Sequence, residues 1–140
     1  MRPAAVAMGF VLCAGPAAAA TLVVQIQGID PGQGVVKLAV CDRSFDAAGC
    51  RHVASRAAKA PVEEFVFDDL APGRYAVAAY HDLNGNGQLD TSMLGLPTEP
   101  YGFSNDVGRE RRPEIGPALV NVDQGRTTAV VRVHPFRSSP

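Results

Sequence analysis

Short oxygen-bearing side chains recur at alternate positions in one stretch of the chain. They are Asp82, Asn84 and Asn86, which are followed by Gly87 and then by Asp90. This is the first part of the D-x-[DN]-x-[DN]-G pattern of calcium loops. Ca²⁺ takes about six to eight oxygen ligands, and alternate short side chains on a curling backbone can direct several of them to one point. The sequence therefore predicts a calcium site in this loop.

The predicted site needs ligands beyond the alternating positions. Gln88 would supply its backbone carbonyl, and Asp90 would bind directly or through water. Met93 stands where an EF-hand loop has its bidentate glutamate, so the last ligand would come from Glu99 or Asp106. The incomplete shell predicts a Kd of about 10⁻⁴–10⁻³ M, as in extracellular modules. The alternative is a turn whose Asp and Asn side chains satisfy its own backbone amides.

His81 raises the alternative that the chain is an enzyme. A small secreted hydrolase could use His81 with Asp82, Asp90 or Arg109. Successive side chains of a strand point to opposite faces, however, which directs His81 away from Asp82. No serine has the setting of a nucleophile elbow. We therefore interpret His81 as a structural residue and expect a non-catalytic protein.

A ligand-binding role has its own candidate residues. Tyr101 and Phe103, with the arginines of residues 109–112, could bind a glycan or a peptide. Packing in the core is the other interpretation of the two rings. The arginines are interrupted by Glu110 and Glu114, as in a solvated loop. We expect a binding module whose ligand is a glycan, a peptide or another envelope protein.

The address of the protein is predicted from its first residues. Residues 1–20 contain Arg2, an apolar run and a small-x-small site before Thr21, as in a secretory signal peptide. Leu12 precedes Cys13 where a lipoprotein signal has a small residue, so lipidation is not expected. No other segment is apolar enough to cross a membrane. We expect a periplasmic or extracellular protein, with residues 21–140 as one domain.

Charge and cysteines narrow the class further. The formal net charge is -1, so no basic surplus suggests nucleic acid as a partner. Cys41 and Cys50 are the cysteines that follow the signal peptide, and an even number in an exported protein favours a disulfide. Such a bridge would contribute about 2–3 kcal/mol. The alternative is two separate buried thiols.

The elements that position these residues are predicted to be short strands. Apolar and polar residues alternate in six segments, and 50–59 adds an edge strand, a loop or a short helix. The first two strands are expected to form an antiparallel hairpin across the turn at 30–34. About seven strands with frequent turns predict an all-β fold, a single Ig-like or prealbumin-like β-sandwich. The six segments are 21–29, 35–41, 62–67, 74–81, 118–122 and 126–134.

A long irregular segment, residues 91–117, precedes the last two strands. Loops of this length are uncommon in compact domains and are usually functional or disordered. Its large apolar residues argue for an ordered segment that packs over the predicted calcium loop. These expected anchors are Leu94, Leu96, Tyr101, Phe103 and Ile115.

Two motif-rich runs resemble one bacterial secreted family, known as domain of unknown function 2141. The resemblance covers nearly the whole mature chain and implies an exported domain without an assigned reaction. It extends, by architecture only, to prealbumin-like sandwiches. Cys41 and Cys50 depart from the usual family pattern. Tyr75 is expected to donate a hydrogen bond to nearby backbone, as in a tyrosine corner. The runs are Phe67-x-x-Leu70-x-Pro72-Gly73-x-Tyr75-Ala76-Val77-x-x-Tyr80-His81-Asp82-x-Asn84-Gly85-Asn86-Gly87-x-Leu89-Asp90 and Leu94-Gly95-Leu96-Pro97-x-Glu99-Pro100-Tyr101-Gly102-Phe103-Ser104-Asn105.

Overall fold

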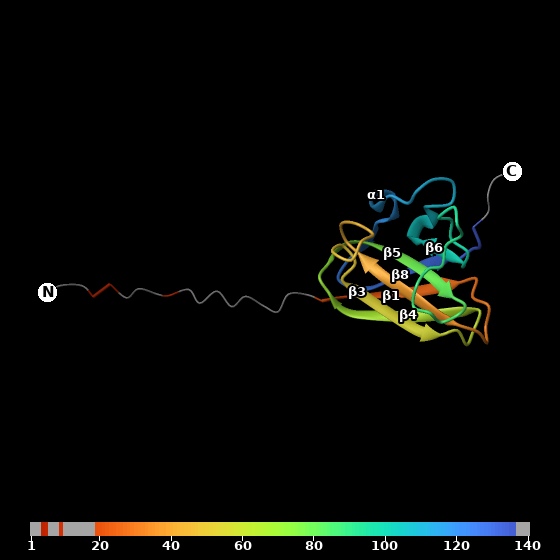
Figure 1. Ribbon diagram of the computed structural model, residues 1–140. Coiled ribbons are helices and arrows are strands. Elements are labelled where there is room, and N and C mark those ends of the chain that lie inside the picture. The colour runs from red at the N-terminus through yellow and green to blue at the C-terminus, as the bar shows by residue number, and fades with distance from the viewer. Residues whose placement is uncertain (1–3, 6–8, 10–18, 137–140) are drawn as a thin grey trace.

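Two β-sheets face each other in the computed structural model, which describes residues 4–5, 9 and 19–136 (Figure 1). One sheet has the strand order β4-β1-β8, and the other has the order β3-β2-β5-β6, with β7 paired to the start of β5. The prediction of an all-β sandwich is confirmed, with eight strands in the described part of the chain instead of about seven. The strands are β1 (Ala20–Gln27), β2 (Val35–Cys41), β3 (His52–Ala57), β4 (Val62–Leu70), β5 (Gly73–Asp82), β6 (Tyr101–Phe103), β7 (Val120–Val122) and β8 (Gly125–Arg132).

The hydrophobic core lies between the two sheets. Each strand turns alternate side chains inward, as the period of two requires. The apolar residues at those positions are buried, so the alternation in the sequence identified the core correctly. Those of the four central strands are Leu22, Val24 and Ile26 of β1, Val36, Leu38 and Val40 of β2, Val77 and Ala79 of β5, and Ala129 and Val131 of β8.

The expected hairpin of the first two strands is wrong. β1 pairs antiparallel with β4 and parallel with β8, whereas β2 lies in the other sheet between β3 and β5. The turn between β1 and β2 crosses from one sheet to the other. Gly32 N–H donates to Ala58 O at 2.8 Å, and Ala58 N–H donates to Gly34 O at 3.2 Å. These bonds tie the turn to the β3–β4 connection instead of closing a hairpin.

Local predictions at the ends of the strands are confirmed. Cys41 and Cys50 form a disulfide between the end of β2 and the start of β3. β3 is an edge strand, as the charged segment 50–59 allowed. The hydroxyl of Tyr75 donates a hydrogen bond to Ala71 O at 2.6 Å, which is the expected tyrosine corner.

The segment 91–117 is ordered but packs differently from the prediction. It contains β6, a short 3-10 helix (Ser104–Asp106) and most of α1 (Ile115–Ala118). Ala118 therefore ends a helix, and the next strand begins only at Val120. Tyr101 and Phe103 are half-buried, but Leu94 is 85% exposed and Leu96 is 37% exposed. Leu94 is therefore not a core anchor.

The first residues of the chain carry the predicted signal peptide. Most of it, including Cys13, lies outside the described residues. β1 begins at Ala20, directly before the predicted cleavage site. Among the described residues, the helices are too short or too polar to span a membrane.

Candidate functional site

The loop of residues 82–90 begins inside the sandwich. β5 ends at Asp82, whose side chain is completely buried. One carboxylate oxygen of Asp82 accepts a hydrogen bond from Asn86 N–H at 3.2 Å, and the other accepts one from Gly87 N–H at 2.8 Å. Asp82 therefore holds the loop in a tight curl around its own carboxylate. Gly87 has a φ of 83°, a conformation that glycine adopts without strain.

The remaining polar side chains of the loop converge on Asp90. The amide groups of Asn84 and Asn86 donate to the two oxygens of Asp90 at 2.5 and 2.8 Å. The side-chain oxygen of Asn86 accepts from Gln88 N–H at 3.0 Å. These bonds match the alternative of a turn that satisfies its own amides. Each carboxylate oxygen still has a second lone pair, so the loop keeps oxygens for a cation.

Glu99 lies against the same loop, 4% exposed. Its oxygens accept hydrogen bonds from Leu83 N–H at 2.9 Å and from Asp90 N–H at 3.1 Å. The chain after the loop folds back to allow this, because His81 N–H donates to Pro100 O at 2.8 Å and extends the pairing of β5. The structure thus brings Glu99 to the place where the sequence required a further ligand.

The three carboxylates of this site are not neutralised by basic side chains. Among the described residues, Asp82, Asp90 and Glu99 form no ion pair. Tyr80 reports the resulting field, since its hydroxyl donates to Gly87 O at 3.2 Å. Burial raises the pKa of Tyr80, and the negative charges of the three carboxylates raise it further. The site is therefore a buried, negatively charged environment.

Asp106 does not join this site. β6 runs antiparallel to β5 and away from the loop, and Ser104 directly after β6 bonds to Val77 N–H. Val77 precedes Asp82 by a distance of about 16 Å along a strand. Asp106 instead forms an ion pair with Arg109 at 2.8 Å.

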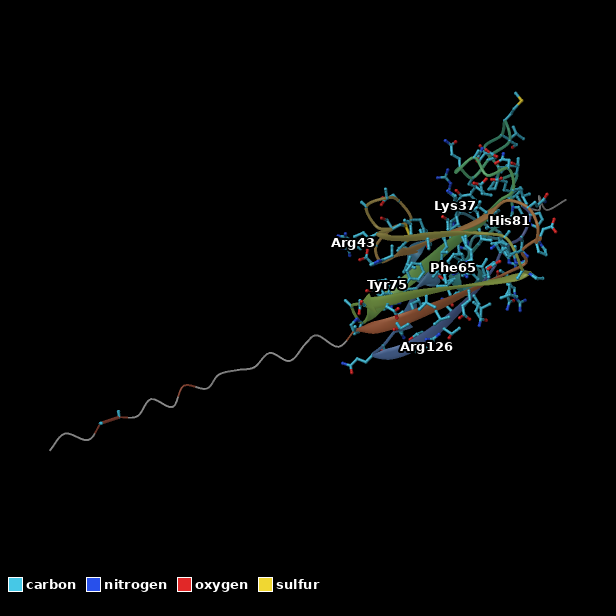
Figure 2. All side chains as sticks on the ribbon, turned by 90° about the horizontal axis from the view of Figure 1, so that it is seen from below. Lys37, Arg43, Phe65, Tyr75, His81 and Arg126 are labelled. Atoms are coloured by element: carbon cyan, nitrogen blue, oxygen red, sulfur yellow. A yellow bond between two sulfur atoms is a disulfide. The ribbon has the colours of Figure 1, made fainter. Side chains whose placement is uncertain are left out.

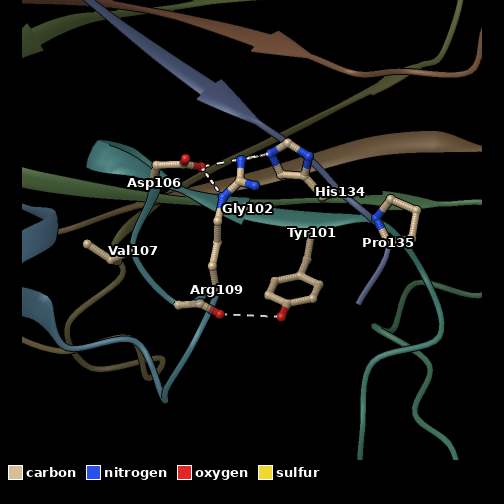
Figure 3. Close-up of a pocket in the computed structure, with 8 residues that line it drawn as sticks. Tyr101, Gly102, Asp106, Val107, Arg109, His134 and Pro135 are labelled. Atoms are coloured by element: carbon tan, nitrogen blue, oxygen red, sulfur yellow. Dashed lines mark hydrogen bonds and ion pairs between the residues drawn. The ribbon is translucent and has the colours of Figure 1, made fainter. Parts of the chain in front are cut away.

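Asp106 belongs to a shallow pocket with Arg109, His134 and Tyr101 (Figure 3). Asp106 lies 3.8 Å from His134 Nε2, which also contacts the guanidinium of Arg109. The hydroxyl of Tyr101 donates to Gly108 O at 3.4 Å. The charged groups satisfy one another, as in the solvated loop that the sequence predicted for the arginines.

His81 is completely buried on the core side of β5. Its Nε2 donates to Gln33 O at 2.8 Å, because a carbonyl can only accept. Its Nδ1 is buried without a hydrogen-bond partner among the described residues. The ring therefore points away from the loop and into the protein, which supports a structural role and counts against the hydrolase alternative.

Comparison with known proteins adds one finding. The model of a bacterial family described as "Uncharacterized protein conserved in bacteria (DUF2141)" matches residues 24–130. The chain belongs to this family. Searches of curated proteins and of solved structures gave no match. The DUF2141 region includes the whole 82–90 loop and Glu99, whereas His134 follows it.

A second surface of this DUF2141 chain was missed by the sequence analysis. It is a groove of about 560 Å³ on the outer face of the larger sheet, with Ala39 and Ala78 at its base and Tyr80, Tyr101 and Phe103 along it. Alternation could have located it, because the small residues Ala39 and Ala78 occupy outward positions of two predicted strands. The pairing of those strands was needed to place the alanines side by side.

Proposed function

We propose that this chain is an exported, non-catalytic binding domain whose 82–90 loop binds Ca²⁺. One observation carries the proposal: Asp82 and Glu99 are buried beside Asp90 without a basic partner in the described part of the chain. Burying unpaired carboxylates is costly, and a divalent cation would offset that cost. Ca²⁺ suits the site because carboxylate, amide and backbone carbonyl oxygens are its preferred ligands.

The ion would act as a structural element. Asp82, Asn84, Asn86 and Asp90 would supply side-chain oxygens, and Gln88 would supply its carbonyl. Glu99 would complete the shell and hold the segment after the loop against β5. Asp106 is no longer a candidate ligand because of its place beside Arg109.

Export and ligand class belong to the same proposal. The disulfide between Cys41 and Cys50 supports an oxidising compartment, the periplasm or the extracellular space. The ligand would be a glycan, a peptide or another envelope protein. Tyr101 and Phe103 support such a role, since both rings are half-buried along the groove.

The test is thermal unfolding in calcium, in magnesium and in chelator, together with calorimetric titration. Calcium at ten times its Kd should stabilise the fold by about 1.4 kcal/mol. That corresponds to a rise in Tm of about 3–6 °C. Asp90→Asn should abolish the rise, and Asp123→Asn, in an exposed turn, should retain it. Equal melting temperatures of the unmodified protein in calcium and in chelator would overturn the calcium proposal.

A further inference from the structure

The groove on the outer face of the larger sheet has an unusually open base. Ala39 of β2 pairs with Val53 of β3 and with Ala78 of β5, which in turn pairs with Phe103 of β6. These residues share the outward face, because directly paired residues point to the same side of a sheet. The two alanine methyl groups leave space that larger residues would fill.

Apolar and aromatic groups border this space. Phe103 packs against Phe45 with ring centroids 4.9 Å apart and against Tyr101 at 6.1 Å. Val53, at the open side, is 72% exposed. Lys37 is the one charged side chain along the groove, and it forms no ion pair with any described residue. The groove therefore suits an apolar group carried by an acidic or neutral segment.

The same chain carries an exposed apolar knob, which we call the tip and which consists of Met93 and Leu94. Met93 is 105% exposed and Leu94 is 85% exposed. The tip is held by a tight turn, in which Ser92 N–H donates to Leu96 O at 2.7 Å and Gly95 N–H donates to Ser92 O at 2.9 Å. The connection from β5 to β6 that contains it projects from the sandwich (Figure 2). An ordered turn thus presents two large apolar side chains to solvent.

We propose that the tip of one copy docks in the groove of a second copy of this chain. A methionine and a leucine side chain match the apolar base, and the Met93 thioether gains favourable contacts with aromatic rings such as Tyr101 and Phe103. Charge is complementary as well. Residues 82–106 include four acidic residues and no Lys, Arg or His, whereas the groove offers Lys37.

A second copy fits these observations better than a lipid bilayer does. Apolar residues that insert into membranes are usually accompanied by lysine or arginine, which attract anionic headgroups. The acidic character of residues 82–106 would repel such a surface. Because Met93 is fully exposed, the tip does not occupy the groove of its own chain and remains available to a neighbour.

The test is analytical ultracentrifugation of the purified protein over a concentration series, with variants of each partner surface. Met93→Ser/Leu94→Ser removes the tip, and Val53→Lys places a charge at the rim of the groove. Either change should weaken self-association by about tenfold or more. Val66→Lys is the matched control, since Val66 is 48% exposed on the edge strand β4 of the other sheet. It should associate as the unmodified protein does.

A mixture of the two variants gives the sharpest result. The tip variant keeps its groove and Val53→Lys keeps its tip, so the mixture should form pairs although neither variant associates alone. A monomeric unmodified protein at every concentration would overturn the proposal, as would variants that associate normally. Binding of the unmodified protein to phosphatidylglycerol vesicles, lost in the tip variant and kept in Val53→Lys, without self-association, would instead identify a lipid surface.

Discussion

Glu99 accepts a hydrogen bond from the backbone N–H of Asp90 at 3.1 Å, and its other oxygen accepts one from Leu83 at 2.9 Å. A single buried side chain therefore joins both ends of the 82–90 loop. This relationship makes the loop and the returning segment one unit, whether or not an ion is bound.

Replacing Glu99 by glutamine should destabilise this unit. A glutamine side chain has one acceptor oxygen, so its NH₂ group would face one of the two backbone N–H groups. The expected loss is about 1–3 kcal/mol of unfolding free energy, measured by urea denaturation in chelator. Glu64→Gln is the control, because Glu64 is exposed and accepts only a 3.4 Å bond from the Gln25 side chain. Equal losses in both variants would contradict the clamp.

Gly102 marks the closest approach of β6 to β8. A Cβ atom at this position would lie 2.0 Å from Arg132 O, so Gly102→Ala must displace backbone. Overpacking of this kind costs about 1–3 kcal/mol or more. Differential scanning calorimetry should show a clear fall in Tm, whereas Gly116→Ala, with open space around its Cβ position, should change it little. Similar Tm values for the two variants would contradict this close approach.

Strand faces could be predicted from the sequence, but strand partners could not. Alternation in β1 correctly directed Leu22 and Ile26 to the core, since the period of two depends only on local geometry. The partner of β1 depends on a turn that crosses between sheets, and the same alternation fits either arrangement. The parallel pairing with β8 joins the two ends of the fold, a contact for which no local pattern exists.

The candidate site shows the same division. The spacing of Asp82, Asn84 and Asn86 predicted a loop that curls around its first carboxylate, because those positions are close along the chain. Glu99 and Asp106 were equal candidates in the sequence. Only the direction of β6, which returns along β5 and then leaves the loop, brings Glu99 in and carries Asp106 away.

Ser104 is a buried residue that sequence analysis did not single out. Its hydroxyl accepts a hydrogen bond from Val77 N–H at 2.9 Å and donates to Ala118 O at 2.5 Å, which links β5 to α1. Ser104→Ala would leave a buried donor and a buried acceptor without this partner, at a cost of about 1–3 kcal/mol. Chemical denaturation measures the loss, and Ser55→Ala on the exposed face of β3 serves as the control. Unchanged stability of Ser104→Ala would show that the link is dispensable.

The Asp42–Arg51 pair, which lies directly beside the disulfide, predicts an acid dependence of stability. The hydrogen bond and the charge of Arg51 hold the pKa of Asp42 below its usual value of 3.8. The folded state thus binds this proton less readily than the unfolded state does. The pair's stabilisation is therefore fully present above pH 3.8 and is lost as the pH falls through the lower folded value.

Asp42→Asn isolates this contribution. Urea midpoints of both proteins, measured between about pH 6 and pH 2, should differ most at the upper end and converge at the lower end. Asp123→Asn, in an exposed turn, controls for the general effect of removing a carboxylate. The difference should be small, since the Asp42 side chain remains 24% exposed and solvent screens the pair. A constant offset between the two curves over the whole range would show that Arg51 does not stabilise the charged form of Asp42.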